Sequence, residues 1–484
     1  MIAEEPASMA GEREKRCCYL EKTKTADLVE GNIPKAIMGF AIPLLIGNLF
    51  QQLYNTVDSY VVGNFVGTSA LAAVGASGSI INMLVGFFMG LSAGAGVVIS
   101  QYFGGGRDKD MSDAVHSAIA LTAFLGVAFT ILGIAFTRPL LHLIGVPEDV
   151  LPHSTLYLTI YFGGIIFSLF YNIGAGILRA IGDSRNPLIY LAVASIMNTV
   201  LDFVFVCYFD MAIAGVAVAT VIAQAASSTL VLYKLMHTKE SYRVELGKIR
   251  FHKKMVRRII SIGFPAALQQ SITSFSNVIV QSYINYFGTA AIAAYSTTIR
   301  IDSFLQMVLQ SFNMTITTFV GQNIGAGKYK RVKQGIHSSW AMCSAIILVG
   351  AVFMNLNAEP LVRIFTSDAD VIRLGGQMLR LFTFFYISLP VIQILNGALR
   401  GGWMQQGAHV FYAGMLCGAA PDLSDDCGSN DRKPYGCYGW LAHYLGYLCD
   451  RYVPVLQEGG LEEVFAVDKA VYHSRRRPAH AMIW

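Results

Sequence analysis

The chain contains 484 residues, of which 54% are hydrophobic and only 14% charged, and its mean hydropathy is +0.49. Soluble globular proteins carry about 25% charged residues, so this composition excludes that class and indicates a polytopic helical membrane protein. The formal net charge of +5 is modest, and it fits basic loops at a membrane surface better than a nucleic-acid-binding surface.

The stretch 1–33 is polar and charged and lacks the apolar core of a signal peptide, so we expect a cytoplasmic leader or an overlong start. Apolar windows of about 20 residues, long enough to cross a bilayer, recur after it. The windows predict a six-helix N-lobe at 34–236, a basic linker at 237–256 and a C-lobe with four recognisable helices at 257–400. The ten predicted spans are 34–63, 70–103, 113–137, 152–179, 187–209, 213–236, 257–286, 291–323, 333–356 and 371–399.

Lysine and arginine concentrate in every second connection. The rich connections are 104–112, 180–186, 237–256 and 324–332, whereas 64–69 and 287–290 contain neither residue. The positive-inside rule places the rich connections in the cytoplasm. We therefore predict a multi-pass protein of the cell inner (plasma) membrane with a cytoplasmic N-terminus.

The two halves of the chain repeat one another. "SQYFGGGR" matches "GQNIGAGK", which aligns Gln101 with Gln322, and "GILRA" matches "GALRG", which aligns Arg179 with Arg400. The offset is 322 − 101 = 221 for the first pair and 400 − 179 = 221 for the second. Six predicted helices separate the copies, so both face the membrane in the same direction. The fold class is therefore all-α, with two parallel-repeat helical lobes.

Asp58 is an acid within the first predicted span, in "LYNTVDSYVVGNF". It shares a stripe about 120° wide with other polar residues of that helix. Such a stripe would be costly against lipid, so it must face protein or water. The repeat carries a second polar stripe, and we expect both to line a substrate cavity between the halves. The expected cavity residues are Gln51, Asn55, Gln270, Asn277, Gln281 and Met307.

A second acid, Asp202, lies in the fifth span, where it shares a face with Ser195 and Asn198. Thr220 and Asn172 add neutral oxygens from neighbouring spans. Two carboxylates among amides and hydroxyls predict a site for a proton or a hard cation. Asp58 and Asp202 would be metal ligands only if that cation is Na⁺.

Both acids could instead be structural, each hydrogen-bonded inside a helix bundle. Inserting one acid at mid-helix costs about 2.5–3.5 kcal/mol, so two acids need a reason. The repeat also places Ile279 or Val280 at the position that matches Asp58. The second half therefore lacks this acid, which argues against a role in packing alone.

Several longer motifs resemble the multidrug and toxic compound extrusion (MATE) family, nearest to its DinF-like branch. They include "IPLLIGNLFQQLYNTVDSYVVGNFVGTSALAAVG", "GILRAIGDSRNP", "NTVLDFVF" and "VGQNIGAGK", and the match covers residues 30–401. The resemblance implies two lobes of six helices and export of drugs, often amphipathic organic cations, in exchange for H⁺ or Na⁺.

The resemblance also implies roles for individual residues. The acids of the branch's N-lobe ion site fall on Asp58 and Asp202, and its supporting residues on Tyr54, Asn198 and Thr220. The family's fourth-helix asparagine falls on Ala175, with Asn172 three residues earlier, so the sequence does not choose between H⁺ and Na⁺.

The family pattern stops after Arg400, and 401–484 offers no apolar window long enough to span a membrane. "LRGGW" stands where the repeat predicts a sequence like "LRAIGDSRNP". We expect a frameshift near codon 402, and the alternative is a genuine soluble tail.

The leading hypothesis is a cation-coupled antiporter and not an enzyme. We expect it to act as a monomer in the lipid bilayer and to transport a small-molecule substrate. We expect no nucleic-acid partner and no cofactor apart from the coupling ion. Nothing supports ATP binding, because "YFGGGRDKD" is a glycine-rich turn without a Walker signature. The alternatives are a lipid-linked oligosaccharide flippase of the same superfamily and a truncated, defective transporter.

Overall fold

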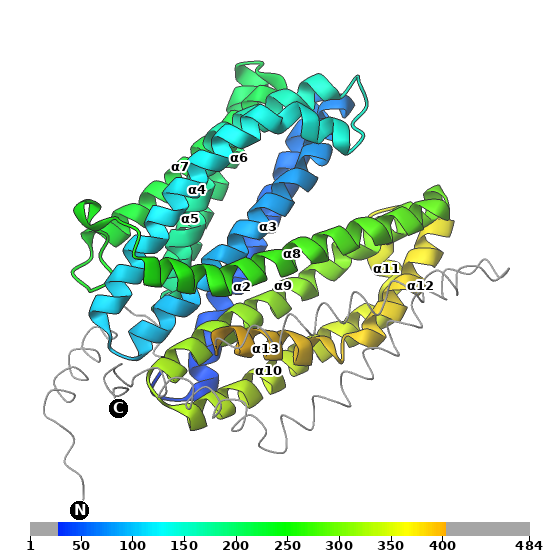
Figure 1. Cartoon of the computed structure of the whole chain (residues 1–484). Helices are drawn as coiled ribbons and strands as arrows, with labels where there is room; N and C mark the ends of the chain where they lie inside the picture. The colour runs from blue at the N-terminus through cyan, green and yellow to red at the C-terminus, as the bar shows by residue number, and fades with distance from the viewer. Residues whose placement is uncertain (1–27, 403–484) are drawn as a thin grey trace, which may run out of the picture. The chain divides into compact units, whose positions relative to one another are not determined.

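A computed structural model of the protein describes residues 28–402 (Figure 1). The leader predicted at 1–33 and the tail at 401–484 lie almost entirely outside these residues. Within the described range the regular secondary structure is entirely helical, which confirms the predicted class. The α-helices are α2 (Ile33–Val61), α3 (Thr68–Gly104), α4 (Asp108–Leu143), α5 (Leu151–Ala180), α6 (Arg185–Phe203), α7 (Ala212–His237), α8 (Lys253–Tyr286), α9 (Thr289–Gly325), α10 (Tyr329–Leu356), α11 (Ala358–Arg363), α12 (Ala369–Phe385) and α13 (Leu389–Gly401).

Nine of the ten predicted spans coincide with one long helix each, and the tenth does not. The stretch 371–399 is two helices, α12 and α13, bent by 53° at a short break. Pro390 stands at the second position of α13, where it cannot donate a helical hydrogen bond and disfavours helical backbone in the residue before it. The apolar pattern continues through this break, which is why the sequence suggested one span.

Seven described helices are both long enough and apolar enough to cross a membrane, and the α12–α13 pair would make eight. Helices α8 and α9 have 34 and 37 residues and are long enough to span a membrane, but their polar side chains make them less apolar than the other seven. Helix length therefore supports the ten predicted spans better than helix hydropathy does. Polar residues at membrane depth must face protein or water.

The described residues divide into two compact units. The first comprises 28–283, 306–339 and 397–402, and the second comprises 284–305 and 340–396. In the first unit, α5 packs against α3, α4 and α7, and α6 packs against α2 and α7. In the second unit, α11 packs against α12.

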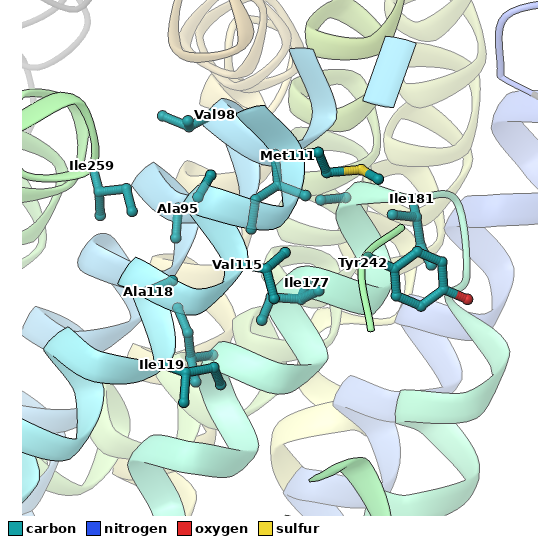
Figure 2. Packing of buried hydrophobic residues seen from close by; sticks show 14 of the residues in the cluster. Ala95, Val98, Met111, Val115, Ala118, Ile119, Ile177, Ile181, Tyr242 and Ile259 are labelled. Atoms are coloured by element: carbon teal, nitrogen blue, oxygen red, sulfur yellow. The ribbon is translucent and has the colours of Figure 1, made fainter. Parts of the chain in front are cut away.

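An apolar cluster joins α3, α4 and α5 within the first unit (Figure 2). Ala95 of α3, Val115 of α4 and Ile177 of α5 are each fully buried in it. Tyr242 belongs to the same cluster and is only 2% exposed, although it lies in the linker at 237–256. The linker is therefore anchored to the helices by its own apolar side chains.

Glycines allow α3 to approach α8 very closely, as their four-residue spacing suggests. A Cβ added to Gly90 would lie 2.3 Å from the backbone nitrogen of Ala267, and one on Gly94 would lie 2.5 Å from Gly263. Real Cβ atoms do not come this near to a backbone, so alanine at either position would push the two helices apart.

The repeated sequence motifs make matching hydrogen bonds. Gln101 Nε2 donates to the carbonyl of Gly401 at 2.9 Å, and Gln322 Nε2 donates to the carbonyl of Ala180 at 2.8 Å. The repeat aligns Gln101 with Gln322, and it aligns Ala180 with Gly401. Each half thus donates to the other at equivalent positions, which supports the predicted equivalence of the two halves.

Candidate functional site

Helices α2 and α6 position the two predicted acids. Asp58 lies one turn after Tyr54 on α2, and Asp202 lies one turn after Asn198 on α6. Both helices then continue into a π-helical turn, at Val62–Val66 after α2 and at Val204–Tyr208 after α6. The two turns contact one another.

Both acids are buried, and each keeps one oxygen without a donor. Asp58 is 7% exposed and Asp202 is 0% exposed. Oδ1 of each has no hydrogen-bond partner among the described residues. The two carboxylates are close enough to interact electrostatically, and the ion pairs found in residues 28–402 include neither of them.

Asn198 and Thr220 hold the second acid in place. In the amide orientation that matches donors to acceptors, Asn198 Nδ2 donates to Asp202 Oδ2 at 3.0 Å and its oxygen accepts from the Thr220 backbone N–H at 3.3 Å. The Thr220 hydroxyl in turn shares a hydrogen bond of 3.3 Å with the hydroxyl of Tyr54. Asp58, Asp202, Asn198, Thr220 and Tyr54, all predicted from the sequence, therefore form one cluster.

Two tyrosines of α5 also belong to this cluster, and the sequence analysis missed them. Tyr157 is 5% exposed and interacts electrostatically with both acids. Tyr161 is 8% exposed and lies one turn further along the same face of α5. Their i, i+4 spacing puts both phenols on one face of an otherwise apolar helix, and this spacing was the available signal.

The chemistry of the cluster suits a proton or a small hard cation. Its available ligands are carboxylate, amide, hydroxyl and phenol oxygens, which hard cations prefer, whereas soft metal ions prefer sulfur. A buried carboxylate with no counter-charge is unfavourable unless it is protonated or binds a cation. The unpartnered Oδ1 atoms of Asp58 and Asp202 are the natural acceptors for either species.

Asn172 lies elsewhere on α5, and the structure does not bring it together with the acids. Its Nδ2 donates to the carbonyl of Ser168 at 2.8 Å. Its side chain lines a small cavity of about 20 Å³ together with Ser92 of α3 and Ile259 of α8. Asn172 follows Tyr161 by eleven residues, about 16 Å along the helix axis, which is too far for one small site.

The predicted substrate-cavity residues all lie in the first unit, with unequal exposure. Asn55, Gln270 and Asn277 are exposed, while Gln51, Gln281 and Met307 are half-buried. Gln270 packs so closely on Gly86 that a Cβ there would lie 2.8 Å from its Cγ. Exposed amides on membrane-length helices indicate surfaces that face water, as a polar cavity requires.

A family model for MatE matches residues 43–204 and 265–422. The two matches begin 265 − 43 = 222 residues apart, as the internal repeat does, and the second continues beyond Gly401. A probable multidrug resistance protein, YpnP of Bacillus subtilis (strain 168), is 31% identical over 378 residues, which are 78% of this chain and 84% of that protein.

Two further comparisons agree with this match. The probable multidrug resistance protein NorM of Thermotoga maritima is 25% identical over 79% of this chain and 82% of its own. Among solved structures, the outward-facing conformation of a multidrug resistance MATE family transporter of the MOP superfamily aligns with a TM-score of 0.74. That alignment is 23% identical and covers 78% of this chain and 85% of the other.

Proposed function

Because this chain belongs to the MATE family of membrane transporters, we propose that it exports drugs or other amphipathic, often cationic, organic compounds. Export occurs by alternating access in exchange for H⁺ or Na⁺. The names of YpnP and NorM, both probable multidrug resistance proteins, support the class of substrate.

The observation that carries the coupling proposal is the pair of buried acids with unpartnered oxygens. An acid at mid-helix costs about 2.5–3.5 kcal/mol, and a structural role would be expected to satisfy both oxygens. Asp58 and Asp202 each leave Oδ1 without a donor among residues 28–402. A bound proton or Na⁺ would supply the missing positive charge.

Coupling follows from differential affinity between two conformations. A cation that binds the acid pair better in one conformation shifts the equilibrium toward it, and a substrate that prefers the other conformation shifts it back. Neither ligand needs to touch the other for exchange to occur.

For the setting, we propose the inner (plasma) membrane with the N-terminus and the 237–256 linker on the cytoplasmic side. The support is the concentration of lysine and arginine in the linker and in alternate loops. The protein would act as a monomer, with no nucleic-acid partner and no cofactor beyond the coupling ion.

The flippase alternative is not favoured. A lipid-linked oligosaccharide flippase would be expected to place basic residues in its cavity, whereas the predicted cavity residues are amides and a methionine. Both curated relatives described above are named for drug resistance. Size-exclusion chromatography of the full chain in detergent tests the defective-transporter alternative. A misfolded chain would not elute as a single monodisperse species.

The test is transport in proteoliposomes that contain the full chain and a fluorescent organic cation. Efflux should accelerate when either an inward pH gradient or an inward Na⁺ gradient is imposed, and the responsive gradient identifies the coupling ion. Equal efflux with no gradient, with a pH gradient and with a Na⁺ gradient would contradict the proposal. Empty liposomes control for passive leakage of the dye.

A further inference from the structure

A groove runs along the outer face of α4 where the linker crosses it. The groove has a volume of about 650 Å³. Its α4 wall includes Phe124, Val127 and Ile131, and its linker wall includes Ile249, Arg250 and Phe251. All of these residues belong to the first unit.

Hydrogen bonds fix the linker wall to α4. The backbone N–H of His252 donates to Ser117 Oγ at 3.2 Å, and His252 Nε2 lies 3.4 Å from Asp113 Oδ1. A few residues earlier, the Glu245 N–H donates to Nε2 of the buried His116 at 3.0 Å. The groove therefore has two ordered walls and is not a gap beside a loose loop.

The groove is mostly apolar, and its large side chains are far more exposed than side chains in a hydrophobic core. Phe124 and Ile131 are each 62% exposed, and Phe251 is 56% exposed. The rings of Phe124 and Phe251 meet edge to face with centroids 6.3 Å apart. An apolar surface of this kind on a membrane helix requires a hydrocarbon neighbour.

Positive charge lies at the linker end of the groove. Arg250 is exposed, and Lys253, Lys254 and Arg257 follow it on the first turns of α8, also exposed. None of these four side chains forms an ion pair within the described part of the chain. The nearby acids are engaged, since Asp113 faces His252 and Glu245 pairs with Lys248 at 3.0 Å.

We propose that this groove binds an anionic phospholipid, with an acyl chain along Phe124, Val127 and Ile131 and the phosphate at Arg250. A guanidinium can hold phosphate oxygens through two parallel hydrogen bonds, and each basic residue near an anionic headgroup contributes about 1 kcal/mol. On the proposed orientation the lipid belongs to the cytoplasmic leaflet. Because the linker connects α7 to α8, the bound lipid would also stabilise the docked linker.

The test uses the full chain in detergent and measures bound lipid by native mass spectrometry and Tm by thermal unfolding. Phosphatidylglycerol should bind in saturable fashion and raise Tm, phosphatidylcholine should do so more weakly, and glycerol 3-phosphate should do neither. Arg250→Gln should weaken phosphatidylglycerol binding about five-fold, as the loss of one basic contact predicts. Ala128→Phe, which fills the groove, should weaken binding of both lipids.

Lys239→Gln is the matched control, because it removes one exposed charge from the same linker away from the groove. It should retain wild-type phosphatidylglycerol affinity. The proposal is overturned if Lys239→Gln and Arg250→Gln weaken binding equally, which would indicate general attraction to basic charge. It is also overturned if glycerol 3-phosphate competes as well as the lipid does, which would indicate a free-phosphate site.

Discussion

Asp302 of α9 accepts a hydrogen bond from the Tyr386 hydroxyl, whereas Asp58 and Asp202 each keep one carboxylate oxygen without a donor among the described residues. Asp302 and Tyr386 lie in the second unit, and the two other acids lie in the first. Asp302 is therefore hydrogen-bonded within the packing of the second unit. The first unit holds two acids in a cluster that lacks positive charge, and under the proposed function this difference would separate a structural carboxylate from a cation-binding one.

Neutralising either of the two first-unit acids should abolish coupled transport. Asp58→Asn and Asp202→Asn should each reduce gradient-driven efflux to the background of empty liposomes, because an amide can neither release a proton nor neutralise Na⁺. Thermal stability should be unchanged or higher, since burying an amide is less costly than burying a carboxylate. Efflux and Tm are measured on the same purified samples. Gradient-driven efflux at the wild-type rate in either variant would remove the acid pair from the mechanism.

Breaking the Tyr386–Asp302 hydrogen bond of the second unit should lower stability and leave coupled transport intact. Tyr386→Phe removes the hydroxyl that donates to Asp302, and Tyr386 is only 3% exposed. The free energy of unfolding should fall by about 1–3 kcal/mol, measured by chemical denaturation in detergent. Gradient-driven efflux, corrected for folded protein, should persist. A variant with wild-type stability and no coupling would reverse the assignment of roles.

The matched glutamines allow a symmetric test of the two halves. Gln322 is 1% exposed and Gln101 is half-buried, although their hydrogen bonds to carbonyls are equivalent. Gln322→Ala should lower the free energy of unfolding by about 1–3 kcal/mol, because it leaves a buried acceptor unpaired. Gln101→Ala should lower the free energy of unfolding by less, because water can replace its amide. A larger loss for Gln101→Ala than for Gln322→Ala in chemical denaturation would show that exposure does not control the size of the effect.

The smallest effect is expected at Glu240, in the linker beyond α7. Burial, and then the neighbouring carboxylate of Asp108, raises the pKa of Glu240 above its usual value. An acid with a raised pKa in the folded state favours folding at low pH, and that contribution is lost as the pH rises through the folded pKa. Glu240→Gln should therefore raise Tm slightly at pH 7.5 and have no effect at pH 4. A difference confined to pH 4 would contradict this sign.

Most of the helical fold could be predicted because long apolar windows leave little choice of structure in a membrane. The break between α12 and α13 was missed because apolarity continues through Tyr386–Ser388 while the backbone changes direction. The short α11 was also missed, since six residues (Ala358–Arg363) are too few to show a helical period.

The candidate site was predictable where charge conflicts with its surroundings. Asp58 and Asp202 stand out because acids are rare in membrane helices, and Asn198 and Thr220 lie within reach of them. Tyr157 was missed because tyrosine is common in membrane helices and its phenol carries no formal charge. Asn172 was assigned to the ion site because it is a polar residue on a neighbouring helix. Neither property shows how far along α5 it lies from the acids.

The most direct measurement is movement of the coupling ion driven by the substrate. Organic cation is added to one side of proteoliposomes that have no initial ion gradient, and counter-movement of H⁺ or Na⁺ is recorded. Counter-movement is expected for the wild type and for Asp302→Asn, and none is expected for Asp58→Asn. Substrate that crosses the membrane through the wild type without any ion moving in the opposite direction would contradict ion-coupled export.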